Sequence, residues 1–270
     1  MILCIDCGNT SIKLGVYDES ALVNKFTIKT NREKTSDEYA YSFKTLIKER
    51  YKIDGCIISS VVPLLTVELT RCIERVFKIK PLILNKSLKT KMSIKLDNPS
   101  ELGADLLAGA IGARKKYGYP LVVADLGTAT KLYVVDDKGA FVGGIISCGM
   151  ETSLKALVDN TSLLMETPIA EPAKIIGKNT KDSIQSGIVL GQAYMVSEFA
   201  RRIENELGYK INRILTGGFA NVIRDEIVCF NYEENLVLDG LFEIYSLNAG
   251  ETIKKAYCCN SLIFKYSIFR

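Results

Sequence analysis

The fold is decided by residues 2–10, ILCIDCGNT, whose pattern returns at residues 121–130 as LVVADLGTAT. In each copy an apolar strand ends in an aspartate, Asp6 or Asp125, and a turn of small or polar residues leads to a second apolar strand. Glycine lets the backbone approach a ligand closely, and hydroxyls and turn N–H groups can bind anionic oxygens. One such turn is weak evidence, since most of them merely connect strands. Two copies predict a duplicated fold that holds a nucleotide between its halves.

The segments around the two copies follow the same order, a three-strand meander followed by helices and a buried strand. We therefore expect a duplicated ribonuclease-H-like α/β fold, with halves at 1–118 and 119–250 around a nucleotide cleft and a tail at 251–270. Leu64 and Val67 are expected on the apolar face of their helix. The expected elements are strands at 2–6, 12–17, 21–28, 55–62, 81–84 and 211–215, a second meander at 121–146, and helices at 37–50, 64–77, 101–117 and 180–207.

The composition is that of a globular protein with a sizeable core, because 47% of the residues are hydrophobic and 24% are charged. A net charge of +4, spread along the chain, does not favour nucleic-acid binding. No apolar run approaches the roughly 20 residues of a membrane span, and the N-terminus opens directly into a strand, so we expect a cytoplasmic protein with no membrane partner. The eight cysteines are expected to be reduced thiols. The absence of histidine excludes Cys/His zinc sites, Ser-His-Asp triads and histidine bases.

The first turn supplies five candidate site residues: Asp6, Gly8, Asn9, Thr10 and Lys13. A carboxylate at a strand end can hold a hydrated magnesium ion, because magnesium prefers carboxylate and water oxygens. The amide, the hydroxyl and the turn N–H groups can cradle phosphate oxygens, while the lysine neutralises charge during transfer. The alternative is a solvated hairpin with a surface lysine.

The second turn supplies Asp125, Gly127, Thr128 and Thr130, either as a second phosphate loop or as a tight turn that caps a core strand. The turn Thr216-Gly217-Gly218 closes a buried strand and fits a nucleotide base or ribose that passes close to the backbone, although a Gly-Gly turn alone is weak evidence.

Asp105 lies early in a helix that is otherwise made of small and apolar residues. It is either a first-turn aspartate favoured by the helix dipole or a general base aimed into the cleft. Its position alone does not decide between these two roles.

Eight motifs, in order and at matching spacing, resemble the type III pantothenate kinases from residue 1 to about residue 247. They are Asp6-x-Gly8-Asn9-Thr10 with Lys13, Ser59-Ser60-Val61-Val62-Pro63, Asp97-Asn98-Pro99-x-Glu101-Leu102-Gly103-Ala104-Asp105, Asp125-x-Gly127-Thr128-Ala129-Thr130, Gly143-Gly144-Ile145-Ile146-Ser147, Ile176-Gly177-Lys178-Asn179-Thr180, Gln185-Ser186-Gly187 and Thr216-Gly217-Gly218. The resemblance implies the fold of sugar kinases, actin and heat-shock chaperone ATPases. It also implies ATP-dependent phosphorylation of the primary hydroxyl of pantothenate, the first step towards coenzyme A, with magnesium and a monovalent cation, potassium or ammonium.

The resemblance further implies a role for each candidate residue. Asp105 would take the proton of the pantothenate hydroxyl, Asp125 would lie near the monovalent cation, and Thr180 would reach the substrate of the neighbouring subunit in a homodimer. The remaining assignments are Asp6, Gly8, Asn9, Thr10 and Lys13 to phosphate and magnesium, Thr128 and Thr130 to phosphate, Thr216, Gly217 and Gly218 to the nucleotide, and Leu96, Gly103, Ala104 and Leu106 to the acceptor.

Four places depart from the pattern of that family, and one of them is Ser147-Cys148-Gly149, where a proline commonly precedes the glycine. Leu106 stands where an arginine helps to bind pantothenate, Leu96 stands where a tyrosine is usual, and Lys131 follows the second turn where threonine is usual. A leucine cannot replace the bidentate grip of a guanidinium on a carboxylate. Three functions stay open: a pantothenate kinase with an altered pocket, a kinase of the same fold for a less acidic hydroxyl compound, and a nucleotide-binding regulator without catalysis.

Overall fold

The computed structural model describes residues 1–249, so the tail expected at 251–270 lies outside the described residues. The chain forms two compact units. Of the described residues, the first contains Met1–Lys91, Gly103–Ile111 and 238–249, and the second contains Met92–Leu102 and Gly112–Val237. These units differ from halves at 1–118 and 119–250, because the chain passes between the units more than once.

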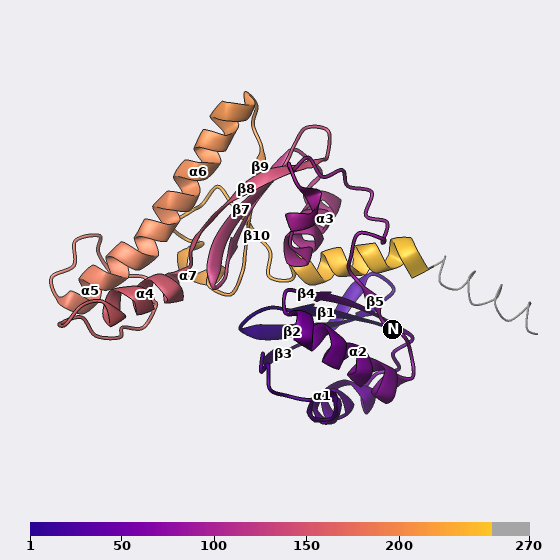
Figure 1. Cartoon of the computed structure of the whole chain (residues 1–270). Helices are drawn as coiled ribbons and strands as arrows, with labels where there is room; N and C mark the ends of the chain where they lie inside the picture. Colours follow the sequence, from indigo (N-terminus) through magenta and orange to yellow (C-terminus); the bar gives the residue numbers. More distant parts are fainter. Residues whose placement is uncertain (250–270) are drawn as a thin grey trace, which may run out of the picture. The chain divides into compact units, whose positions relative to one another are not determined.

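The first unit is built on a five-stranded sheet in the order β3-β2-β1-β4-β5 (Figure 1). The meander is antiparallel, as expected, and β4 and β5 extend the sheet in parallel. The strands are β1 (Ile2–Cys7), β2 (Ser11–Asp18), β3 (Ala21–Lys29), β4 (Gly55–Ser60) and β5 (Leu82–Ile83). The helical segments are α1 (Ser36–Phe43), the π segment η1 (Lys44–Lys48) and α2 (Pro63–Phe77).

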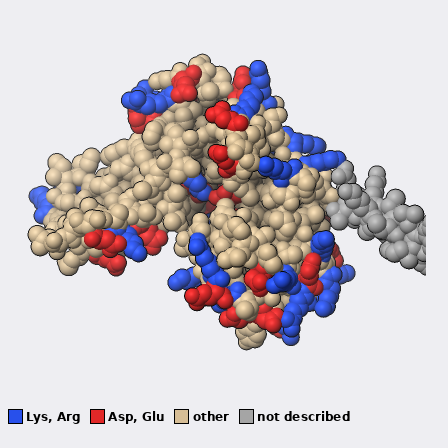
Figure 2. Space-filling view, viewed as in Figure 1, with Lys and Arg blue, Asp and Glu red and all other residues tan. Residues whose placement is uncertain are grey.

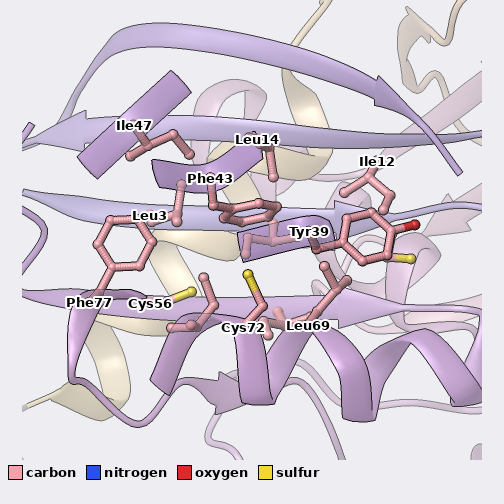
Figure 3. Close-up of a cluster of buried hydrophobic side chains, with 14 of the residues drawn as sticks. Leu3, Ile12, Leu14, Tyr39, Phe43, Ile47, Cys56, Leu69, Cys72 and Phe77 are labelled. Carbon is pink, nitrogen blue, oxygen red and sulfur yellow. The ribbon is translucent and has the colours of Figure 1, made fainter. Parts of the chain in front are cut away.

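The core of this unit lies between α1, α2 and one face of the sheet, as Figure 3 shows. Alternate residues of β1 and β2, such as Leu3 and Leu14, meet Phe43 of α1 and Leu69 of α2 there. Leu64 and Val67 were expected on the buried face of α2, but they are 71% and 50% exposed. The helix instead buries a stripe that begins at Leu65, because that row of side chains faces the sheet.

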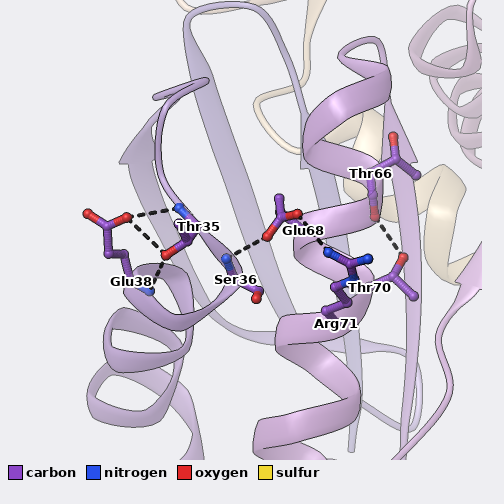
Figure 4. A network of polar contacts seen from close by, with 7 residues as sticks. All are labelled: Thr35, Ser36, Glu38, Thr66, Glu68, Thr70 and Arg71. Carbon is purple, nitrogen blue, oxygen red and sulfur yellow. Dashed lines mark hydrogen bonds and ion pairs between the residues drawn. The ribbon is translucent and has the colours of Figure 1, made fainter.

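Polar contacts fix where α1 begins. Thr35 and Glu38 form a capping box, in which each side chain accepts a hydrogen bond from the other residue's backbone N–H (Figure 4). Glu68 of α2 accepts a hydrogen bond of 2.7 Å from the backbone N–H of Ser36 and pairs with Arg71 (Figure 4). These contacts tie the start of α1 to α2.

A helix at residues 236–249, which the sequence did not predict, covers the opposite face of the first sheet. Phe242 stacks on Tyr17 with 4.8 Å between ring centroids, and the Tyr17 hydroxyl donates a hydrogen bond of 2.6 Å to Asp239. A Cβ at Gly55 would overlap the phenol of Tyr245, so a glycine is required in β4 at this point.

The second unit repeats the strand order of the first, as β10-β9-β6-β7-β8. An antiparallel meander again leads into parallel strands, which confirms the predicted duplication. The strands are β6 (Leu121–Leu126), β7 (Ala129–Val135), β8 (Phe141–Cys148), β9 (Asn212–Thr216) and β10 (Asn231–Tyr232).

Helices cover the core face of the second sheet, where Val189, Ala193, Val196 and Ala200 pack against β6 and β7. The predicted helix at 180–207 is one helical run with a π segment inside it, and α4 was not predicted. The helical segments are α4 (Met150–Asp159), α5 (Thr180–Gln185), the π segment η3 (Ser186–Leu190), α6 (Gly191–Leu207) and α7 (Ala220–Ile223). Within residues 1–249, no helix is both long and apolar enough to cross a membrane.

Candidate functional site

Asp6 is the last polar residue of β1, on the sheet face opposite the core of α1 and α2. Its neighbours across the sheet are Lys13 on β2 and Ser59 on β4. Ser59 is fully buried, and its hydroxyl finds no hydrogen-bond partner among the described residues. A carboxylate beside a buried, unsatisfied hydroxyl fits a hydrated magnesium ion, which needs one or two carboxylates and keeps several waters.

The turn after β1 exposes Asn9 and Thr10 and holds its shape through backbone bonds. Gly8 donates from its N–H to the Ser11 carbonyl at 3.0 Å, which closes the turn. The Asn9 side chain accepts a hydrogen bond of 3.0 Å from Arg32. Arg32 was missed in the sequence, because it follows β3 and only the pairing of β3 with β2 brings it beside this turn.

The second unit repeats the arrangement around Asp6 with different residues. Asp125 is the next-to-last residue of β6, its neighbour on β7 is Lys131, and its neighbour on β9 is Thr216. In both units an aspartate therefore stands between a lysine and a hydroxyl residue. The repeat of this trio at one place in each sheet extends the duplication from the fold to the candidate site.

The implied monovalent cation does not fit the residues around Asp125. The Lys131 ammonium lies 3.1 Å from Oδ2 of Asp125, and both side chains are about four-fifths buried. This ammonium would repel a potassium ion on the same carboxylate, since two unit charges about 4 Å apart repel by roughly 4 kcal/mol at an effective dielectric constant of 20. The ammonium of Lys131 already supplies the positive charge that Asp125 attracts.

The two threonines of the second turn have different surroundings. Thr128 is exposed, whereas Thr130 is fully buried and donates a hydrogen bond of 2.7 Å to the Gln192 side chain. Gln192 in turn donates to the Cys148 carbonyl at 2.8 Å. Thr130 faces the core because residues alternate between the two faces of a strand. Its hydroxyl is therefore not offered to a phosphate in this structure, contrary to its sequence-based assignment.

In the turn Thr216-Gly217-Gly218, the two glycines differ in their surroundings. Gly217 has a φ of +102°, and a Cβ there would lie 2.5 Å from the backbone N of Leu126. Its close backbone approach is thus to the neighbouring strand of the sheet. A Cβ at Gly218 would meet no atom within 4 Å, so this second glycine has open space around it.

Asp105 lies in the first turn of α3 (Ala104–Tyr117), which begins three residues later than predicted. A separate 3-10 turn, η2 (Pro99–Glu101), precedes it and is capped by the Asn98 side chain. An acidic residue is favoured at this first-turn position, because the helix dipole is positive at this end. A Cβ at Gly103 would lie 2.6 Å from Oδ1 of Asp105, so the glycine leaves room for the carboxylate.

Three further residues assigned to the acceptor, Ala104, Leu106 and Leu96, are partly exposed. Ala104 and Leu106 lie on α3, and Leu96 lies in the irregular segment that precedes η2. Near Leu96, Lys95 pairs with the buried Asp136 at 2.6 Å. Burial raises the pKa of Asp136, but the Lys95 ammonium and the Ala140 and Lys138 N–H groups lower it further, so the pKa lies below its ordinary value.

Thr180 is the first residue of α5 and lines an open cavity of about 540 Å³ within the second unit. The cavity wall combines apolar side chains with the polar run Lys178, Asn179 and Thr180. Asn179 caps α5 by accepting a hydrogen bond of 2.9 Å from the Asp182 N–H. Thr180 therefore lines a cavity of ligand size within the second unit.

The cysteines of the described part carry free thiols, in agreement with the expectation from the sequence. Burial raises the pKa of the Cys4 and Cys56 thiols well above the ordinary value. Such thiols are poor nucleophiles and poor metal ligands at neutral pH. They act as small core residues.

A sequence profile of the type III pantothenate kinases matches residues 2–202. The chain is 39% identical over 253 residues to the type III pantothenate kinase of Halalkalibacterium halodurans, with 92% of this chain and 100% of that protein covered. A protein from Campylobacter jejuni assigned to the Baf family of transcriptional activators has a similar structure, with a TM-score of 0.60, 17% identity, and 92% and 99% coverage of the two chains. The ethanolamine utilization protein EutJ of Carboxydothermus hydrogenoformans gives a TM-score of 0.53 at 12% identity, with 88% of each chain covered.

The two structural likenesses support the duplicated ribonuclease-H-like fold of the actin-like ATPases. The profile covers most of the chain, and the curated relative aligns over its full length. Together with the repeated aspartate–lysine–hydroxyl arrangement, these matches show that the chain belongs to the type III pantothenate kinase family.

Proposed function

We propose that this protein transfers the γ-phosphoryl group of ATP to the primary hydroxyl of pantothenate, the first step of coenzyme A synthesis. The observation that carries the proposal is the repeated arrangement in which Asp6 and Asp125 are each the next-to-last residue of the central strand of a sheet, between a lysine and a hydroxyl residue. Phosphoryl transfer depends on positioning and on neutralising charge, and oxygen ligands, backbone donors and ammonium groups supply both.

In the first unit, Asp6 would hold magnesium through water, and Gly8, Asn9, Thr10 and Lys13 would bind phosphate oxygens. When bound, magnesium supplies the charge that neutralises the phosphate oxygens during transfer. The exposure of Asn9 and Thr10 supports this role, since both lie at the surface of a turn whose shape is held by backbone bonds. Arg32, held beside Asn9, adds a guanidinium suited to phosphate.

In the second unit, the exposed Thr128 would bind phosphate, and the open space at Gly218 would admit part of the nucleotide. Thr216 would contact the nucleotide from its position on β9 beside Asp125. A glycine is needed at position 217 because its backbone passes close to β6. It would contribute to the site by allowing the turn to stay close to that strand.

Asp105 would act as the general base that accepts the proton of the pantothenate hydroxyl. It lies in the first turn of α3, where an acidic side chain is favoured by the helix dipole, and Gly103 leaves room for its carboxylate. Loss of a general base costs about 10²- to 10⁴-fold in rate. We expect Asp105→Asn to lower kcat by that factor in a coupled assay with magnesium, ATP and pantothenate, while ATP binding, measured by calorimetry, stays unchanged. A variant that keeps more than half of the wild-type kcat would refute this role.

A kinase for a less acidic hydroxyl compound is the second candidate. Leu96 and Leu106 favour it, because both are partly exposed and neither can bind a carboxylate. The same assay with a panel of pantothenate-like hydroxyl compounds separates the two candidates. Phosphorylation of a neutral analogue at a higher kcat/KM than pantothenate would replace the first proposal with the second.

The active form would be a homodimer in the cytoplasm, with Thr180 reaching the partner's substrate. Apolar side chains are exposed on and around α4, α5 and the segment between them, including Leu163, Met165, Ile175 and Ile176. In the view of Figure 2 this region, on the left, shows large uncharged areas. An exposed apolar surface next to the cavity at Thr180 is what a subunit interface requires.

A further inference from the structure

We infer that the ammonium of Lys131 takes the place of the monovalent cation, so that this kinase is active without potassium or ammonium ions. The inference rests on the proposed kinase function and on the place near a monovalent cation that the family resemblance implies for Asp125. It goes beyond both, because it assigns the positive charge at this place to the chain itself.

The first support is the contact between the two side chains. Lys131 lies directly opposite Asp125 in the antiparallel pair β6–β7, and residues in such a pair project to the same face of the sheet. The ammonium is 3.1 Å from Oδ2 of the carboxylate. The side chains of Lys131 and Asp125 are only 20% and 17% exposed, so water screens the pair less than it screens a surface ion pair.

The second support is the symmetry between the two units. Lys13 stands opposite Asp6 in β1–β2 just as Lys131 stands opposite Asp125 in β6–β7. The duplicated fold thus holds a lysine at both positions, one for each phosphate turn. A residue fixed by the register of a hairpin keeps its charge in place, whereas an ion from solution must be captured.

The third support is chemical. The ammonium ion is one of the two cations that the family resemblance implies, and a lysine ends in an ammonium group that carries the same charge and three N–H donors. Threonine, which is usual after the second turn in that family, offers an oxygen and no charge. A lysine at this position therefore supplies the cation and also repels a second one from the same carboxylate.

The test compares the wild-type protein with Lys131→Thr in buffers whose only monovalent cation is tetramethylammonium, with and without added potassium chloride. We expect wild-type kcat with ATP, magnesium and pantothenate to be the same in both buffers. The variant should lose about 10²- to 10³-fold without potassium, the usual cost of removing one preorganised electrostatic group, and regain activity when potassium or ammonium is added. The matched control is Lys138→Thr, because Lys138 is an exposed lysine at the other end of the β7–β8 hairpin. This variant should behave as wild type.

A second readout does not depend on activity. A cation that binds only the folded state raises Tm by mass action, so potassium should raise the Tm of Lys131→Thr and leave that of wild type and Lys138→Thr unchanged. Tetramethylammonium chloride at equal ionic strength controls for screening. Activation of the wild-type enzyme by potassium, or a potassium-dependent rise of its Tm, would overturn the inference even if the variant does not fold. A wild-type protein that is inactive with every cation would refute the proposed function instead, while the Tm comparison would still decide the role of Lys131.

Discussion

Replacing Gly103 with alanine tests whether the position of the Asp105 carboxylate controls the rate. A Cβ at residue 103 would lie 2.6 Å from Oδ1 of Asp105, whereas ordinary contact begins at 3.4 Å. The carboxylate must therefore move by about 0.8 Å. The φ of Gly103 is outside the left-handed region, so alanine fits the backbone and the displaced side chain is the main effect.

The expected loss follows from the size of that displacement. A misplacement of about 1 Å in a reacting group can cost about 10²-fold, so we expect kcat to fall by about 10- to 100-fold. This corresponds to roughly 1.4–2.8 kcal/mol in the barrier. Stability should not fall, since a Gly→Ala change with a compatible backbone usually stabilises by about 0.4–1 kcal/mol.

The assay is steady-state kinetics with ATP and pantothenate, together with thermal unfolding and ATP binding by calorimetry. The matched control is Gly191→Ala at the start of α6, where an added Cβ meets no atom within 4 Å. Its kcat should equal that of wild type. The reasoning fails if Gly103→Ala keeps more than half of wild-type kcat, or if its lower activity is matched by a lower Tm.

Three further predictions concern the acceptor, the assembly and the stability. The double variant Leu96→Tyr, Leu106→Arg should lower KM for pantothenate by about 10- to 150-fold with little change in kcat. The reason is that a hydrogen bond to a charged group contributes roughly 1.5–3 kcal/mol. A native KM already in the low micromolar range would show that other residues hold the carboxylate. Light scattering at micromolar concentration should find a dimer, with the helix at 180–207 in its interface, and a fully active monomer would contradict this. Glu204→Gln should cost about 1.5–3 kcal/mol of unfolding free energy at neutral pH. Burial raises the pKa of Glu204, but hydrogen bonds from Lys210 and Arg213 lower it further, so the pKa lies below its ordinary value of 4.5. The stability that Glu204 contributes is therefore present above pH 4.5 and is lost as pH falls through the folded-state pKa. If urea unfolding shows that Glu204→Gln lowers stability equally at acidic and neutral pH, the prediction is wrong.

The repeated hairpin made the fold predictable from the sequence, because each copy combines an alternating or continuous apolar pattern with a glycine turn. Local chemistry of this kind fixed most strands within one or two residues, as at β2 and β6. It also placed α2 at Pro63, since proline is favoured in the first turn of a helix. The predicted cytoplasmic location stays a prediction.

Other features could not be predicted because they depend on which face of an element meets a distant one. Leu64 and Leu65 are equally apolar, yet only Leu65 faces the sheet. The helix at 236–249 is buried by contacts with Tyr17 and Gly55, which lie at the other end of the chain. Arg32 became a candidate only when β3 brought it beside the first turn.

The sequence by itself determined the duplication, the two aspartates at strand ends and the family, because strand endings and turns are set by neighbouring residues. The tertiary structure decided which side chains serve the site. The strand alternation turned Thr130 to the core and Lys131 to the face of Asp125, although both follow the same turn. The pairing of β6 with β7 then placed the ammonium on the carboxylate, a contact that depends on the register between strands and that no single segment encodes.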